Sequence, residues 1–140
     1  MFGNDRDSMR RYYLQCWQKF QEKQPLNALE QQIANVVAEH PEYHRLLQLH
    51  ETAIQRDYLP DTGETNPFLH MGLHLGIREQ VATNRPAGII ELYQQLMIKY
   101  GTHEAEHRMM DCLAESIWLA QRQQTPPDEQ AYLDCLKTRG

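Results

Sequence analysis

Apolar residues recur along this chain at intervals of three and four positions, the spacing that lines one face of an α-helix. The first such stripe, between about residues 5 and 23, comprises Met9, Tyr12, Tyr13, Cys16, Trp17 and Phe20. The positions around it are mainly charged or glutamine, which predicts a surface helix with one buried face. Glutamine, glutamate, leucine and alanine are abundant and β-branched residues are few, so the whole sequence favours helix.

Breaks that contain proline or glycine divide the rest of the chain into further helical segments. Pro41 interrupts the pattern because proline lacks a backbone N–H and restricts the residue before it. The clearest loop is PDTGETNP at residues 60–67, and TPPDE precedes a short terminal helix. The predicted helices cover residues 27–39, 41–56, 66–84, 86–100, 102–124 and 128–137. The pattern predicts an all-α fold, a single-domain helical bundle of about six to seven helices over residues 1–140.

The segment NPFLHMGLHLGIREQ, residues 66–80, predicts the central helix of this bundle. Asn66 is a favoured N-cap residue, and the proline after it suits the first helical position. The segment is apolar on nearly all sides, which is typical of a buried helix. Two glycines in a GxxxG motif lie roughly opposite His70 and His74, where a neighbouring backbone can approach closely. A buried helix therefore carries two imidazoles on one face, one turn apart.

Composition and charge narrow the class of partner. The chain has 140 residues, of which 41% are apolar and 24% charged, so it can bury a core as one domain. A net charge of −5 argues against nucleic acid and against an anionic membrane as partners. No run reaches the ~18 apolar residues of a membrane span. The charged start, MFGNDRDSMRR, lacks the apolar core of a signal peptide, so we expect a cytoplasmic protein.

The three cysteines, Cys16, Cys112 and Cys135, share no CxxC or zinc-finger spacing. Each falls in a helical pattern beside apolar residues, where a thiol usually packs as a small hydrophobe. We therefore expect them to be thiols, and a reducing cytoplasm suits this use of cysteine.

The strongest signal is a histidine spacing that occurs three times, in the pairs His40/His44, His70/His74 and His103/His107. Seven histidines scattered at random over this length would give about 0.3 such pairs. The i,i+4 spacing places two imidazoles on adjacent turns, close enough to bind one metal ion or two neighbouring ions. Helical bundles build metal sites from inward side chains of facing helices, and neutral imidazole brings no charge into the core. The pattern therefore predicts a metal site.

Carboxylates near these pairs complete the candidate ligand set. Glu106 projects to the buried side of its helix, where a carboxylate needs a cation or strong hydrogen bonds. Glu30 lies at the margin of the inner face of its helix. The alternative for the histidines is packing as core imidazoles held by hydrogen bonds, and the unpaired His50 is predicted to be one of these. We predict His70, His74, His103 and His107 as the centre of the site, with Glu106, His40, His44 and Glu30 as further metal ligands.

Other charged residues near the pairs are placed outside this set. Asp111 and Glu115 drift toward the edge of their helix, so they are candidates for outer contacts or for solvent exposure. Glu79 points nearly opposite to His70 and is expected to pair with an arginine. Arg78 follows His74 by four residues and can lie beside it.

The chemistry of the predicted site leaves several functions open. Histidine with carboxylate and without thiolate suits iron, zinc or manganese. Two ions with open positions would permit oxygen or peroxide chemistry, whereas one open zinc or nickel ion would activate water for hydrolysis or support thiol transfer. No Ser-His-Asp, P-loop, dinucleotide or CxxCH motif is present. We expect a metal-binding protein, with a redox or hydrolytic metalloenzyme as one form of it and its small-molecule substrate unknown.

A second hypothesis belongs to another class of protein. In it the chain is a non-catalytic helical adaptor or a homodimer without metal, and the aromatic stripe Tyr12, Tyr13, Trp17 and Phe20 contacts the partner. The same stripe would also be expected if it simply closes the core of the protein itself.

Three segments of the chain carry a resemblance to a known family, namely MFGNDRDSMRR, AEHPEYH and TNPFLHMGLHLGIREQ. Together they resemble a family of small proteobacterial proteins that is known only as a domain of unknown function. The resemblance spans nearly the whole chain and implies no activity, cofactor or site residue. Haemerythrin-like bundles are similar only in outline, because their ligand order is missing. Bundles of the damage-inducible DinB type, also similar only in outline, bind one metal through a lone histidine and an HxxxH. Here His70 and His74 would supply the HxxxH, with His40, His44, His103 or His107 as the third ligand.

Overall fold

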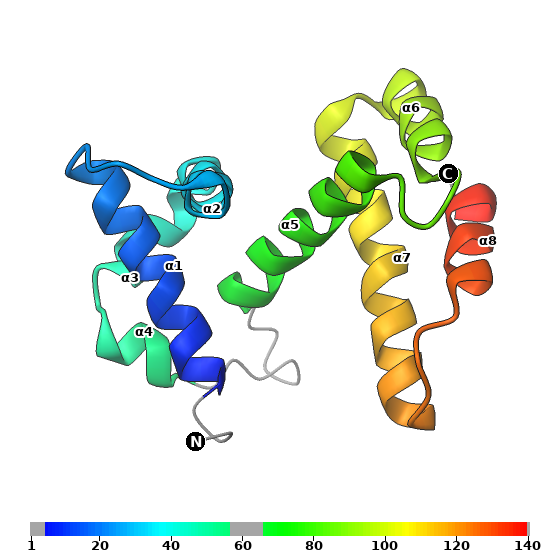
Figure 1. The fold of residues 1–140 in the computed structure, drawn as a ribbon. Helices are drawn as coiled ribbons and strands as arrows, with labels where there is room; N and C mark the ends of the chain where they lie inside the picture. Colours follow the sequence, from blue (N-terminus) through cyan, green and yellow to red (C-terminus); the bar gives the residue numbers. More distant parts are fainter. Residues whose placement is uncertain (1–4, 57–65, 140) are drawn as a thin grey trace. The chain divides into compact units, whose positions relative to one another are not determined.

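The computed structural model describes residues 5–56 and 66–139, whose path is shown in Figure 1. Within these two segments the chain forms eight α-helices, one short 3-10 helix and no strand, which confirms the all-α class. None of the helices in the described segments is long and apolar enough to cross a membrane. The chain divides into two compact units, residues 1–71 and 72–140, and the boundary falls inside a helix. Folding of the whole chain as a single domain stays a prediction.

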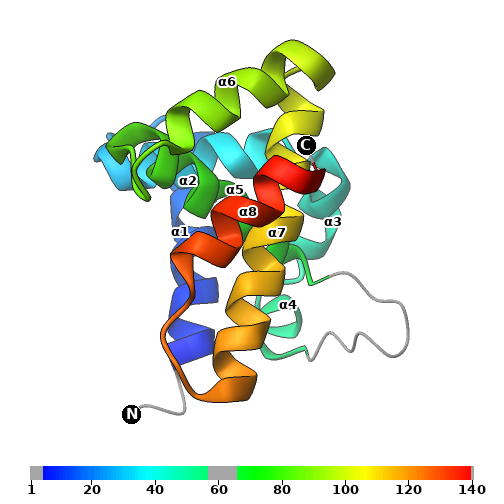
Figure 2. The same ribbon diagram turned by 90° about the vertical axis from the view of Figure 1, so that its right-hand side faces the viewer.

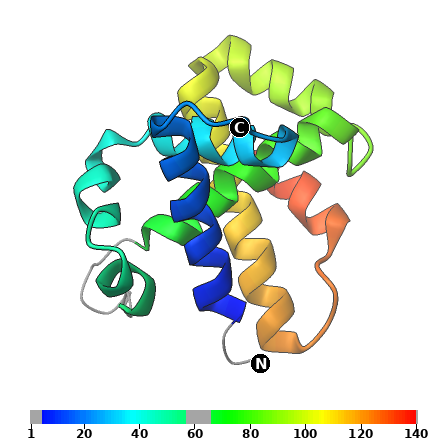
Figure 3. The same ribbon diagram turned by 60° about the vertical axis from the view of Figure 1, so that its left-hand side comes forward.

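The first unit is built on α1 (Asp5–Gln21) and α2 (Ala28–Ala38), which pack against each other (Figure 3). Asn27 forms a capping box at the start of α2, where its side chain accepts a hydrogen bond from the Glu30 N–H. The buried face of α2 meets the apolar residues of α1, as the periodicity predicts. Its fully or nearly fully buried apolar residues are Ile33, Ala34, Val36 and Val37.

The segment after Pro41 departs from the predicted helix over residues 41–56. A 3-10 turn, η2 (Pro41–Tyr43), leads into the short α3 (His44–Leu47), and α4 (Glu51–Gln55) follows as a separate helix. Between them His50 has a φ of 49°, which cannot continue a right-handed helix. Its side chain is exposed, so the expectation of a buried core histidine is wrong.

Arg10 is buried on α1 at a position that the periodicity assigned to solvent. Its exposed fraction is 4%, whereas that of the neighbouring Met9, assigned to the buried stripe, is 51%. The Arg10 Nη1 donates hydrogen bonds to the carbonyl oxygens of Ile54 (2.8 Å) and Arg56 (2.9 Å) at the end of α4. Carbonyl groups at the end of a helix carry partial negative charge, so a guanidinium stabilises them. Arg10 thereby fixes α4 against α1.

The aromatic stripe of α1 packs mainly within its own unit. Tyr13 is buried, and the Trp17 ring contacts the rings of Phe20 and His44 at centroid distances of 5.4 and 4.6 Å. This packing accounts for most of the stripe without a partner protein. The adaptor or homodimer hypothesis stays a prediction.

The histidine-bearing helix α5 (Pro67–Thr83) begins in the first unit and continues into the second. Asn66 caps it as predicted, because its Oδ1 accepts hydrogen bonds from the N–H groups of Phe68 and Leu69. Of the predicted loop at 60–67, all but the last two residues lie outside the described residues. A Cβ on Gly76 would lie 3.3 Å from a methyl carbon of Leu113, so a side chain, not a backbone, approaches this glycine.

The second unit continues through α6 (Ile89–Tyr100), α7 (Thr102–Gln123) and α8 (Glu129–Arg139). The long α7 packs against both α6 and α8 (Figure 2). Helix α6 begins three residues after the predicted start at Pro86, because Gly88 adopts a φ of 94° and residues 86–88 form a bend and turn. The buried residues of this unit's core are Ile77, Ile89, Leu96, Ala105, Met109, Met110, Cys112, Tyr132 and Leu136.

Cys112 of α7 and Cys135 of α8 form a disulfide, so the expectation that all three cysteines are thiols is wrong for this pair. Their Cα atoms are 5.9 Å apart, since the packing of α8 on α7 brings together two residues separated by 23 positions. Cys16 is a buried thiol, as predicted. Disulfides are typical of oxidising compartments, which counts against the reducing environment inferred from the cysteine spacing. The cytoplasmic localisation stays a prediction.

We predict that alkylation of the unfolded, unreduced protein labels one thiol, at Cys16, and that alkylation after reduction labels three. Because a cross-link restricts the unfolded chain, reduction should lower the free energy of unfolding by about 3 kcal/mol. Mass spectrometry counts the labels, and urea unfolding with and without reductant measures the stability. The Cys112→Ala/Cys135→Ala double variant is the control, since reductant should not change its stability. Three labelled thiols in protein purified without reductant would contradict the disulfide.

Candidate metal centre

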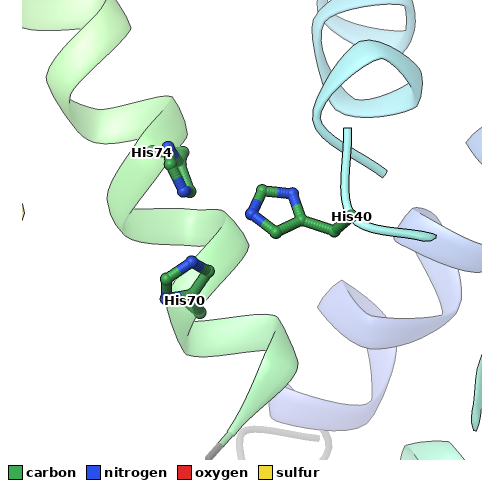
Figure 4. Close-up of side chains that lie close together, drawn as sticks. All are labelled: His40, His70 and His74. Carbon is green, nitrogen blue, oxygen red and sulfur yellow. The ribbon is translucent and has the colours of Figure 1, made fainter. Parts of the chain in front are cut away.

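Three of the predicted histidines gather in one group. His40, His70 and His74 each offer a ring nitrogen, and these nitrogens lie within 4.8 Å of one another (Figure 4). His40 and His74 are buried, with exposed fractions of 5% and 3%, and His70 is half-buried. Among the described residues this is the one group of three or more histidine, cysteine or acidic side chains spaced to hold a metal ion.

His40 is placed by the end of α2. It precedes Pro41, which disfavours helical backbone at this residue, and its φ of −123° and ψ of 65° lead the chain out of α2. The His40 Nδ1 lies 2.7 Å from the carbonyl oxygen of Val36. Because a carbonyl can only accept, Nδ1 carries the proton, and in the neutral ring the lone pair is on Nε2. This leaves Nε2 as the nitrogen of His40 that can bind a metal.

His40 and His70 meet inside the first unit. Their ring centroids are 5.1 Å apart, with the planes nearly perpendicular. Tyr43 stacks on His40 at 5.5 Å and also contacts the edge of His70 at 6.1 Å. Tyr43, which the sequence marks only as an apolar position, therefore holds both imidazoles from one side.

His74 follows His70 by one turn of the continuous helix α5, so the two imidazoles project from the same face. The boundary between the two units falls between these turns, and helix geometry alone fixes the relation of His74 to His70. The His74 Nδ1 contacts a carboxylate oxygen of Glu106 on α7. An ionised carboxylate also can only accept, so the lone pair of the neutral His74 ring is again on Nε2.

Glu106 is a buried carboxylate with two cationic or donor partners, as the sequence requires. Besides His74, it contacts Arg78, whose Nη2 and Nε lie 3.1 and 3.2 Å from Oε1. Burial acts to raise the pKa of Glu106, but the hydrogen bonds from His74 and Arg78 outweigh it and hold the pKa below the ordinary value. Glu106 therefore stays ionised at neutral pH and orients His74, rather than joining the group of three histidines.

The Glu106 carboxylate also lines a cavity of about 200 Å³ within the second unit. The other residues that line it are Ile77, Arg78, Val81, Ala82 and Tyr93. A dry cavity of about 150 Å³ suffices to hold benzene, so this space is large enough for a small molecule. A molecule bound there would touch the carboxylate that orients His74.

His103 and His107 lie on α7 but outside the group of three. Their ring centroids are 4.2 Å apart, and the His107 ring lies 5.0 Å from that of His74 within the second unit. Burial, together with the neighbouring His103 and His74, lowers the pKa of His107, so its ring is neutral at pH 7. The structure thus places His107 beside His74, and His103 beside His107.

His44 and Glu30 are directed elsewhere. The His44 Nε2 lies 2.7 Å from the carbonyl oxygen of Val37. The Glu30 carboxylate accepts hydrogen bonds from the backbone N–H of Asn27 (2.9 Å) and from the Lys19 ammonium (2.7 Å). Backbone groups therefore satisfy His44, and a backbone N–H together with Lys19 satisfies Glu30. Their role as metal ligands stays a prediction.

The remaining acidic candidates lie at the surface. Glu79 and Asp111 are exposed, and Glu115 forms an ion pair with Arg139. Arg78 lies beside His74 as its i+4 spacing predicts, and the two share Glu106 as a partner.

We predict that Glu106→Gln lowers the free energy of unfolding of the metal-free protein by about 2 kcal/mol, because it removes a charged partner from two groups at a buried position. Urea unfolding in EDTA at pH 7 measures this. The matched control is Glu104→Gln, which breaks the exposed pair with Arg108 and should cost less than about 0.5 kcal/mol. Equal stabilities of the two variants would contradict the structural role of Glu106.

A second prediction concerns pH. Hydrogen bonds from the Asn27 N–H and from Lys19 lower the pKa of Glu30. A carboxylate with a lowered folded-state pKa adds stability above its unfolded pKa, and this is lost as pH falls through the folded value. Glu30→Gln should therefore lower the melting temperature at pH 7, and the difference should shrink below about pH 4. Metal content should not change.

Thermal melts of wild type and variant between pH 3 and pH 7 test this, with the exposed Glu42→Gln as control. A difference at pH 3 as large as that at pH 7 would exclude the ionised carboxylate as its cause.

Comparison with known proteins gives a family but no function. No curated protein and no solved structure was found to match the chain. The family described as a domain of unknown function (DUF1841) matches residues 5–138, a span that includes all the candidate ligands. The resemblance to a small family of unknown function is thereby confirmed, and the proteobacterial origin stays a prediction. The chain belongs to the DUF1841 family.

Proposed function

We propose that this protein binds one transition metal ion through His40, His70 and His74. The observation that carries the proposal is the convergence of three imidazole nitrogens within 4.8 Å from two separate segments of the chain. Tetrahedral coordination with metal–nitrogen bonds of about 2.1 Å separates the ligand nitrogens by roughly 3.4 Å, so small rotations of the rings suffice. Three histidines at this spacing, two of them buried, match the donor set of a metal site better than that of a packed core.

The contacts behind the ligands support the same function. The Nδ1 atoms of His40 and His74 each face an oxygen that accepts a hydrogen bond, a carbonyl for one and a carboxylate for the other. In protein metal sites the second ring nitrogen is usually held in this way, which fixes the tautomer and raises the basicity of the ligand. Glu106 also adds a negative charge on the Nδ1 side of the His74 ring, opposite the nitrogen that would bind the ion. This arrangement is similar to the lone histidine with an HxxxH of the DinB-type bundles.

The donor set points to a small group of metals and to an open site. Three neutral imidazoles without thiolate suit zinc, iron or manganese. Three protein ligands are typical of catalytic zinc sites, which keep a coordination position for water or substrate, and structural sites have four. Such an ion supplies Lewis-acid chemistry or an activated water. We therefore place a hydrolytic enzyme ahead of a redox enzyme within this proposal.

The proposal predicts near-stoichiometric metal in protein purified without a chelator or an affinity tag. Elemental analysis after growth with added zinc, iron and manganese measures the content. His40→Ala, His70→Ala and His74→Ala should each reduce it to below about a tenth, since loss of even an outer partner of a ligand costs roughly 10–100-fold in affinity. His50→Ala is the matched control, because His50 is exposed and outside the group.

Stability gives an independent measure of the same binding. A ligand that binds only the folded state at 100 times its dissociation constant adds about 2.7 kcal/mol, so EDTA should lower the melting temperature of the wild type. His74→Ala should melt at the same temperature with and without EDTA. The proposed function would be contradicted if the wild type is purified without metal and EDTA leaves its melting temperature unchanged. Equal metal content in all four variants would contradict it as well.

A further inference from the structure

The pair His103 and His107 stands at the start of α7, in the second unit. Gly101, with a φ of 86°, turns the chain out of α6, and α7 begins at Thr102. The i,i+4 spacing puts the two imidazoles on adjacent turns, and their ring centroids are 4.2 Å apart. His103 is exposed and His107 is half-buried, with its Nε2 atom buried, so an ion from solvent reaches the pair from the side of His103.

The pair His103/His107 differs from His40/His44 in the contacts of its imidazole rings. His44 contacts the Val37 carbonyl through Nε2 and packs against Trp17 in a tilted arrangement, so its Nε2 already has a backbone partner. In contrast, the rings of His103 and His107 contact each other directly. Ring nitrogens of His70 and His74 lie within 4.8 Å of each other, and the rings of His103 and His107 are in contact. Two of the three HxxxH pairs therefore keep both imidazoles within reach of one ion.

Charged groups of both signs surround the pair. The ionised Glu106 carboxylate precedes His107 in the chain, and the His107 ring lies 5.0 Å from that of His74. Glu104, on the exposed side, pairs with Arg108 at 3.2 Å and adds a second carboxylate to the same helical turn. The pair is therefore flanked by two carboxylates and one arginine on α7, with His74 and Arg78 of α5 facing Glu106.

We propose that His103 and His107 bind a second divalent metal ion, separate from the ion held by His40, His70 and His74. The ligand class is a divalent ion that prefers imidazole nitrogen, namely zinc, nickel or copper, with water at its remaining positions. Two ligands, one of them exposed, hold an ion more weakly than three ligands of which two are buried, so the second ion exchanges with solvent. The protein then carries two ions, one fixed and one exchangeable.

Calorimetric titration of the metal-free protein with zinc tests this proposal. The wild type should bind two ions, the second more weakly. His103→Ala and His107→Ala should each bind one, because a single remaining imidazole loses more than the roughly 10–100-fold that an outer partner contributes. His40→Ala should retain one weakly bound ion, and His50→Ala should still bind two. Circular dichroism confirms that the helices of each variant are intact.

The possible outcomes separate this proposal from the proposed function. If the wild type binds one ion, and His40→Ala loses this ion while His103→Ala retains it, the second site is overturned and the first is kept. Two ions in the wild type and in both α7 variants place the second ion elsewhere and overturn the proposal. One ion that only the α7 variants remove supports the second site and contradicts the first. A wild type that binds no zinc overturns both.

Discussion

The arrangement of the candidate site depends on one constraint, the burial of the Glu106 carboxylate. An ionised carboxylate among apolar side chains is tolerated only when charged or donor groups surround it. The chain supplies these groups from a single helix, with His74 and Arg78 one turn apart on α5 and both in contact with Glu106. Because the carboxylate accepts from the His74 Nδ1, it also selects the ring nitrogen that can bind a metal. The hydrogen bond that makes burial of Glu106 possible thereby also orients His74 as a metal ligand.

The end of α2 and the start of α5 orient the other two ligands, His40 and His70. Pro41 follows α2 and places His40 where the Val36 carbonyl accepts a hydrogen bond from its Nδ1–H. Asn66 and Pro67 start α5 at a defined residue, which fixes the phase that turns His70 and His74 to one face. Each ligand is thus oriented by a hydrogen bond or a helix start that exists without the metal. Such preorganisation lowers the cost of binding an ion.

Much of the fold and part of the site could be predicted from the sequence, since they depend on local chemistry. The start of α5, the HxxxH on its buried face and the need of Glu106 for a cation follow from residue type and spacing. Contacts between distant segments could not be predicted in this way. Periodicity placed Met9 in the core and Arg10 outside, whereas the carbonyl groups at the end of α4 draw Arg10 inward. Likewise, the Cys112–Cys135 bond exists because α8 packs on α7.

The central claim, that imidazoles from His40, His70 and His74 bind one ion, is tested most directly by X-ray absorption at the zinc edge of protein loaded with one equivalent of zinc. We expect nitrogen or oxygen neighbours at about 2.0–2.1 Å, with outer scattering from three imidazoles and no sulfur. In the His74→Ala variant the spectrum should lose one imidazole or the ion itself. A sulfur shell at about 2.3 Å, or a spectrum that His74→Ala leaves unchanged, would contradict binding by these three histidines.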